Sequence, residues 1–114
     1  MLSIKRLPIR RHVHYVIVAH DFKDPEAPAR RQQARPEHLE RAKRFHESGN
    51  IIIGGPILDE TDKSKMVGSI MLVDMPSKKK IQEWIDSDPY IKNRVWNNIE
   101  IYPYKLVDVA VPKK

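Results

Sequence analysis

Hydrophobic and polar residues alternate along the chain in a way that predicts four β-strands. The run from Val13 to Ala19 (VHYVIVA) is rich in the β-branched and aromatic residues that strands favour. Three further strands are expected, at Asn50–Ile53 closed by Gly54-Gly55-Pro56, at Met66–Met75 with Gly68 as a bulge or point of close approach, and at roughly Trp96–Val107.

Two helices are predicted between these strands. Pro36 suits the first position of a helix, and the apolar stripe His38, Ala42 and Phe45 follows at helical spacing until Gly49. The polar stretch with proline and arginine that precedes Pro36 is expected to be irregular. Because His38 would then lie in the first turn, the positive end of the helix dipole should keep its imidazole neutral.

The second helix is expected to begin after Ser77, a residue that favours the N-cap position. Its apolar residues Ile81, Trp84 and Ile85 recur at helical spacing. Asp88-Pro89 should interrupt the helix and begin a short helical turn.

The resulting order, β-α-β-β-α-β, predicts an α+β, ferredoxin-like fold with both helices on one face of an antiparallel sheet. In the last strand, simple alternation puts Trp96 and Tyr102 on one side and Ile99 and Ile101 on the other. Since both sides carry apolar groups, we expect the open face to be covered by a second copy of the chain in a homodimer.

Composition limits the chain to one modest domain. It has 114 residues, of which 40% are hydrophobic. No run is long enough to span a membrane, so no membrane association is expected. The absence of cysteine excludes disulfides and thiolate catalysis and fits a reducing, cytoplasmic compartment.

The formal net charge of +6 is concentrated near the N-terminus, where no acidic residue precedes Asp21. We therefore divide the chain into a basic tail at 1–12, a domain at 13–109 and a C-terminal tail at 110–114. The Met-Leu-Ser start leaves open a mitochondrial presequence, although Pro8 would interrupt its helix. A nucleic-acid partner is not favoured, because the excess charge lies in a tail and Lys78-Lys79-Lys80 fits a solvated helix face.

One histidine and one carboxylate stand out as candidate chemistry. His38 lies on the apolar stripe of its helix, and Asp88 follows Trp84 by four residues, so both should point into the core. A histidine beside a carboxylate can act as a general base, with the carboxylate stabilising the imidazolium after proton transfer. The alternatives are a structural histidine and an aspartate that only caps the following turn.

Other patterns point less clearly to function. His12, His14 and His20 share one side of the first strand, but nothing evident completes a metal site, so no metal is expected. His20-Asp21, at the end of the strand, is expected to border the cleft as a second polar pair. No phosphate-binding glycine loop or nucleotide fingerprint is present, and no cofactor is implied.

Five segments together resemble the YCII-related (YciI-like) family across about Val13–Val107. They are Tyr15-Val16-Ile17-Val18-Ala19, Arg35-Pro36-Glu37-His38-Leu39, Gly55-Pro56, Gly68-Ser69 and Ser87-Asp88-Pro89-Tyr90. The resemblance implies a dimeric α/β-barrel fold, a site at His38 and Asp88, and a pocket shaped by Gly55, Pro56 and Ser69. Dehydrochlorination of a chlorinated hydroxyquinol is the chemistry of one branch. Asn93-Arg94 stands where the family often has Ala-Gly, and Arg94 is expected to face water.

We therefore expect a small cofactor-independent enzyme, an isomerase or a lyase, that abstracts a proton from a small oxygenated organic molecule. His38 would be the base and Asp88 would orient it. The alternative is a non-catalytic ligand-binding or assembly module in which the two residues form a structural hydrogen bond.

Overall fold

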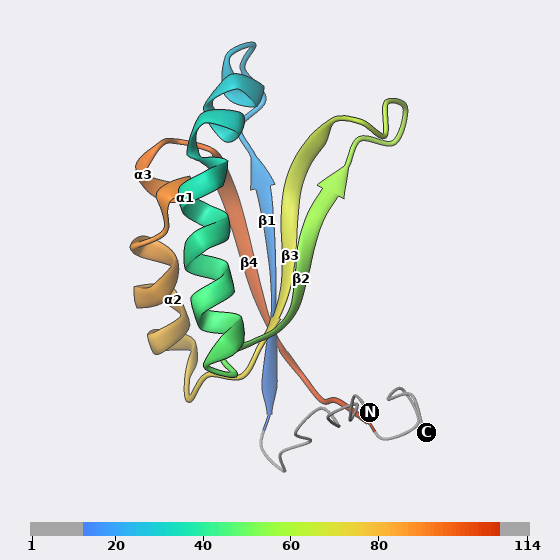
Figure 1. Cartoon of the computed structure of the whole chain (residues 1–114). Coiled ribbons are helices and arrows are strands. Elements are labelled where there is room, and N and C mark those ends of the chain that lie inside the picture. Colours follow the sequence, from blue (N-terminus) through green and yellow to red (C-terminus); the bar gives the residue numbers. More distant parts are fainter. Residues whose placement is uncertain (1–12, 108–114) are drawn as a thin grey trace, which may run out of the picture.

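The computed structural model describes residues 13–107, so the expected tails and His12 lie outside the described residues. The elements are β1 (His14–Asp21), α1 (Ala27–Glu47), β2 (Ile51–Leu58), β3 (Met66–Val73), α2 (Lys78–Asp86), α3 (Pro89–Lys92) and β4 (Trp96–Tyr104). The strands form one antiparallel sheet in the order β2-β3-β1-β4. All the helices lie on one side of this sheet (Figure 1). The predicted α+β, ferredoxin-like fold is confirmed.

Helix α1 is much longer than predicted. It begins at Ala27, not at Pro36, and Pro36 lies inside it. The expectation of an irregular stretch before Pro36 is therefore wrong. The buried residues of α1 continue the stripe of His38 toward the N-terminus at helical spacing, through Ala34, Arg31 and Ala27. Pro36 cannot donate to the carbonyl of Gln32, and the packing of α1 on the sheet offsets that loss.

Strand β2 also extends further than predicted, because Gly54-Gly55-Pro56 continues the strand instead of closing it. Proline lacks the N–H that a central strand would need, but β2 is an edge strand, where proline is tolerated. Gly68 lies on β3 and, as predicted, is a point where another strand approaches closely. A Cβ at Gly68 would lie 2.5 Å from the carbonyl oxygen of Ala19.

An irregularity in β4 reverses the predicted orientation of Trp96. Asp21 of β1 pairs with Trp96, whereas His20 pairs with Asn98, so Asn97 is an extra residue on β4. Trp96 therefore lies on the same face as Ile99 and Ile101 and is buried in the core. The prediction that it shares a face with Tyr102 is wrong, because simple alternation does not hold across the bulge.

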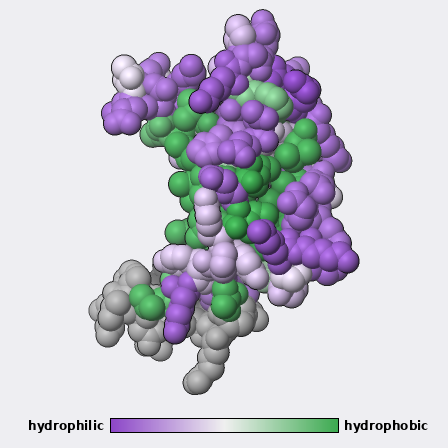
Figure 2. Space-filling view, turned by 180° about the vertical axis from the view of Figure 1, so that it is seen from behind, coloured by the Kyte–Doolittle hydropathy of each residue, from purple (hydrophilic) through white to green (hydrophobic). Residues whose placement is uncertain are grey.

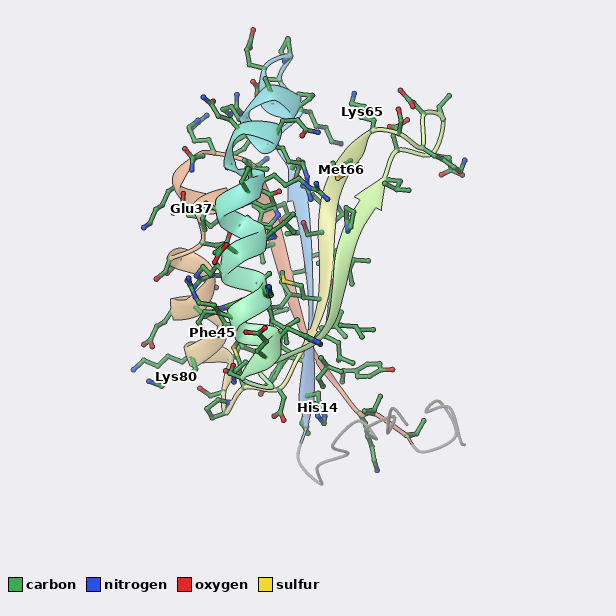
Figure 3. All side chains as sticks on the ribbon, in the orientation of Figure 1. His14, Glu37, Phe45, Lys65, Met66 and Lys80 are labelled. Carbon is green, nitrogen blue, oxygen red and sulfur yellow. The ribbon has the colours of Figure 1, made fainter. Side chains whose placement is uncertain are left out.

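The core fills the space between the helices and the sheet. Helix α2 begins as predicted, with the Ser77 side chain accepting a hydrogen bond from the backbone N–H of Lys80. Its apolar side, Ile81, Trp84 and Ile85, is buried. The side chain of Lys80 points away from the sheet (Figure 3), and the three lysines of this turn are exposed.

Candidate active site

His38 and Asp88 lie against each other between α1 and α3. The Nδ1 atom of His38 is 2.9 Å from Oδ1 of Asp88. Asp88 is 1% exposed and His38 is 9% exposed. Because a carboxylate oxygen accepts, the neutral ring carries its proton on Nδ1, and Nε2 is left as an acceptor. Nε2 has no hydrogen-bond partner within residues 13–107.

Asp88 is both the partner of His38 and the N-cap of α3. Its Oδ1 also accepts from the backbone N–H of Tyr90 at 2.9 Å, and its Oδ2 accepts from Nη1 of Arg41 at 2.9 Å. The second guanidinium nitrogen of Arg41 donates to the carbonyl of Trp84 at 2.6 Å. The two interpretations of Asp88 that the sequence left open are therefore compatible, and three donors fix the carboxylate in place.

The dipole argument for a neutral His38 does not hold. His38 lies near the middle of α1, because the helix begins at Ala27, and the field of the dipole is concentrated in the first turn. What surrounds the imidazole instead is aromatic. Its ring stacks on Tyr90, with centroids 3.8 Å apart and planes at 9°, and meets the edge of Trp96 at 5.5 Å. This packing fixes the plane of the imidazole ring.

A second buried charged pair lies beside the first. Nη1 of Arg31, on α1, is 2.8 Å from both carboxylate oxygens of Asp21, at the end of β1. Nη2 of Arg31 donates to the carbonyl of Gly68 and to the hydroxyl oxygen of Ser69, each at 3.0 Å. Its guanidinium carbon lies 4.8 Å from the centre of the Tyr90 ring. Burial raises the pKa of Asp21, and the charge of Arg31 opposes that rise.

A cavity of about 460 Å³ lies between α1 and the β2–β3 side of the sheet. His38, Gly55, Pro56 and Ser69 all line it, so the structure brings four of the predicted site residues to one cavity. Asp88 does not line the cavity and supports His38 from behind. A role in catalysis or binding for these residues stays a prediction.

Comparison with known proteins identifies the family. The YCII-related domain matches residues 13–105. The chain belongs to the YCII-related family. Protein YciI of Escherichia coli O6:H1 (strain CFT073) is 32% identical over 97 residues, which cover 82% of this chain and 97% of that protein. Aspercryptin biosynthesis cluster protein B of Emericella nidulans is 32% identical over 97 residues, which cover 79% of this chain and 62% of that protein.

A solved structure shares the fold of this YCII-related chain. The 5-chloro-2-hydroxyhydroquinone dehydrochlorinase of Burkholderia phenoliruptrix AC1100, in complex with 2,5-dihydroxybenzoquinone, aligns with a TM-score of 0.69 and 22% identity. The alignment covers 81% of this chain and 93% of the dehydrochlorinase chain. The likeness supports the ferredoxin-like fold, and the dimer that the sequence implied stays a prediction.

His20 does not border the cavity, contrary to expectation. It lies on the opposite face of the sheet and is exposed, with Nε2 3.4 Å from Oε1 of Glu100. Neighbouring residues on a strand point to opposite faces, so Asp21 faces the helices and His20 cannot. Arg94 is exposed and does not line the cavity; its guanidinium lies over Phe22, 4.7 Å from the ring centre.

The sequence did not point to Arg31 or Tyr90 as residues of the candidate site. Arg31 was hidden because α1 was not expected to reach it, and an arginine in a polar stretch gives no signal of burial. The available signal was its spacing, because Arg31 and Ala34 precede His38 by seven and four residues, on the same helix face. In the sequence, Tyr90 stands out only as the last residue of the segment Ser87-Asp88-Pro89-Tyr90.

The described residues contain neither a metal-binding cluster nor a membrane-spanning helix. Within residues 13–107, no three His, Asp or Glu side chains gather closely enough to hold a metal ion. In the same part of the chain, every helix is too short or too polar to cross a membrane.

Proposed function

We propose that this protein is a small cofactor-independent enzyme in which His38 abstracts a proton from a small oxygenated organic molecule. The observation that carries the proposal is the geometry of His38. Its Nδ1 is held by Asp88 at 2.9 Å, and its Nε2 has no partner within the described residues while the residue lines the cavity. A base oriented in this way needs no movement before it accepts a proton.

The proposed reaction is either an isomerisation or an elimination. Nε2 of His38 takes a proton from a C–H or O–H group beside a carbonyl or enol, and the electron pair moves into the conjugated system. Return of the proton to another atom gives an isomer, whereas departure of an anionic leaving group gives an elimination product. Asp88 stabilises the imidazolium through the Nδ1–H bond.

The relatives support this chemistry without fixing the substrate. The neighbour of known structure is named as a dehydrochlorinase and holds a small quinoid molecule. One relative is named for an aspercryptin biosynthesis cluster, and another for a cluster that makes a derivative of benzaldehyde. A His–Asp pair suits such compounds, because an enol or quinol oxygen acidifies the neighbouring proton.

The test is a thermal-shift screen of hydroxylated aromatics, lactones and enol acids, followed by turnover assays with each compound that stabilises the protein. In His38→Gln, turnover should fall by about 100-fold or more, the size of a lost general base. The fold should survive, because Asp88 keeps its bonds to Arg41 and to the N–H of Tyr90. His20→Gln is the matched control, since His20 lies on the other sheet face and should keep full turnover.

The rival function is a ligand-binding or assembly module in which the pair is structural. It is favoured by the two donors from α1, His38 and Arg41, which tie that helix to the N-cap of α3 whether or not the protein is an enzyme. Under this rival, no compound is turned over and His38→Gln lowers the melting temperature by many degrees. That combination of results would end the enzyme proposal.

We also propose that the protein is a homodimer formed through the open face of the sheet. Large hydrophobic side chains on this face are exposed, among them Ile70 at 46%, Tyr102 at 50% and Tyr104 at 39%. Figure 2 shows hydrophobic residues gathered in the middle of the molecule and reaching its hollowed side. A contiguous exposed patch of this kind is typical of an interface.

A further inference from the structure

The charges around the cavity are unbalanced. No acidic residue is among the described residues that line it, whereas three basic residues, Arg31, Arg35 and Lys43, do. Asp21 and Asp88 lie close by, but each is already engaged. Asp21 pairs with Arg31, and Asp88 is shared by His38 and Arg41.

Within the described residues, this arrangement leaves Arg35 and Lys43 without an acidic partner, and Arg35 is the more buried of the two. It lies one turn after Arg31 and three residues before His38, so all three project from the same side of α1. It is half-buried and lines the cavity, and no acidic side chain pairs with it within residues 13–107. Glu37, two residues on, is about 200° further around the helix, and it is exposed on another side of α1 (Figure 3). A half-buried, unpaired guanidinium favours an anionic ligand.

Two hydroxyl groups add neutral hydrogen-bonding capacity. Tyr90 is 0% exposed and lines the cavity, yet its hydroxyl has no hydrogen-bond partner within the described residues. Burial raises the pKa of Tyr90, although Arg31 and Arg35 oppose the rise, so the hydroxyl keeps its proton and can donate it. Ser69 Oγ accepts from Arg31 at 3.0 Å and from Trp96 at 3.2 Å, which leaves its own proton uncommitted.

We propose that the cavity binds a small organic anion, such as a carboxylate or an ionised enol or phenol. Arg35 selects its charge, and the hydroxyls of Tyr90 and Ser69 donate to its oxygen atoms. The inference rests on the proposed function in that the ligand shares the cavity with His38, and it narrows the substrate class to anions. It also explains why the hydroxyl groups of Tyr90 and Ser69 are buried, because a bound anion would supply the hydrogen-bond acceptor that each of them lacks.

The test is calorimetric titration with two matched probes. 2,5-Dihydroxybenzoquinone is a flat acid that is ionised at neutral pH, and its dimethyl ether has the same ring but no charge. The wild type should bind the anion about tenfold or more tightly than the ether. Arg35→Gln should lose about tenfold in affinity for the anion and leave binding of the ether unchanged, whereas Arg35→Lys should keep most of the affinity.

Two further variants complete the design. Arg44→Gln removes the same charge from the same helix, but Arg44 is exposed and does not line the cavity, so binding should not change. Tyr90→Phe keeps the ring that stacks on His38 and should weaken binding of the anion several-fold. The melting temperature of each variant confirms that the fold is retained.

Failure of this inference is distinguishable from failure of the proposed function. Equal affinity for the two probes, no binding of either at millimolar concentration, or wild-type binding by Arg35→Gln would overturn the anion site. None of these results bears on whether His38 abstracts a proton. Conversely, His38→Gln should still bind the anion, because the charge of Arg35 is unchanged. If this variant turned over substrate at the wild-type rate, the catalytic proposal would fail and the anion site would stand.

Discussion

At the residue scale, Asp88 shows how one carboxylate serves the fold and the candidate site together. Its Oδ1 accepts from His38 and from the backbone of Tyr90, and its Oδ2 accepts from Arg41. In water each of these hydrogen bonds would contribute little free energy. In a buried site the three together hold the carboxylate in one orientation. The orientation of His38, and hence the direction in which Nε2 points, follows from this fixed partner.

The Arg31–Asp21 pair is the residue-scale feature with the clearest consequence for stability. Asp21→Ala would leave the guanidinium of Arg31 buried without its counter-charge, so the free energy of unfolding should fall by about 3–5 kcal/mol in urea denaturation. The double variant Asp21→Ala, Arg31→Met removes both charges and should be less destabilised than the single variant. A single variant within about 1 kcal/mol of the wild type would show that the pair is not a buried ion pair in solution.

At the element scale, α2 could be predicted from the sequence, whereas the part of α1 before Pro36 could not. Ser77 and the stripe of Ile81, Trp84 and Ile85 carry strong local signals for α2. The buried side of α1 before His38 consists instead of alanine and arginine, which give no hydrophobic periodicity. His38 and Asp88 could be found because both lie on apolar stripes. Arg31 could not, because its burial depends on its pairing with Asp21, which lies on another element.

The turn between α3 and β4 carries backbone strain at Arg94. Its φ is 57°, in the left-handed region that glycine adopts freely and that costs other residues about 1–2 kcal/mol. Arg94→Gly should therefore be more stable than Arg94→Ala by about 1 kcal/mol in urea denaturation. Both variants lose the guanidinium over Phe22, so their difference isolates the backbone. Equal stability of the two variants would mean that the turn relaxes to negative φ.

The start of α1 should be sensitive to acid through Asp24. Two hydrogen bonds from Arg30 lower the pKa of Asp24 to about 2 from its ordinary 3.8. A lowered pKa in the folded state contributes stability above pH 3.8, and that contribution is lost as the pH falls through about 2. Asp24→Asn should therefore melt below the wild type at pH 5, and the gap should close toward pH 2. A gap that is constant with pH would contradict the ion pair.

At the scale of the whole molecule, the proposed site and the proposed dimer interface lie on opposite faces of one sheet. The cavity is on the helix side, whereas Ile70, Tyr102 and Tyr104 are on the open side. Alternation along β1 and β3 separates the two surfaces, because successive side chains of a strand point to opposite faces. A change on the open face should therefore alter assembly before it alters the cavity.

If the protein is a homodimer, one charge placed on the open face of the sheet should change its mass in solution. Ile70→Asp places a carboxylate in the middle of the open face and should convert a dimer to a monomer in light scattering coupled to size exclusion. Lys79→Asp changes an exposed residue on the helix side and should leave the mass unchanged. A wild type that runs as a monomer at high concentration would contradict the proposed dimer.

The central claim is that Asp88 holds His38 with its proton on Nδ1 and with Nε2 ready to accept a proton at the cavity. Long-range ¹H–¹⁵N NMR of the imidazole nitrogens, in wild type and in Asp88→Asn, tests it without a known substrate. The account predicts the Nδ1–H tautomer in the neutral wild-type ring, with an unprotonated Nε2 whose signal moves when 2,5-dihydroxybenzoquinone is added. A neutral ring that carries its proton on Nε2 would contradict the account, because such a ring has no base facing the cavity.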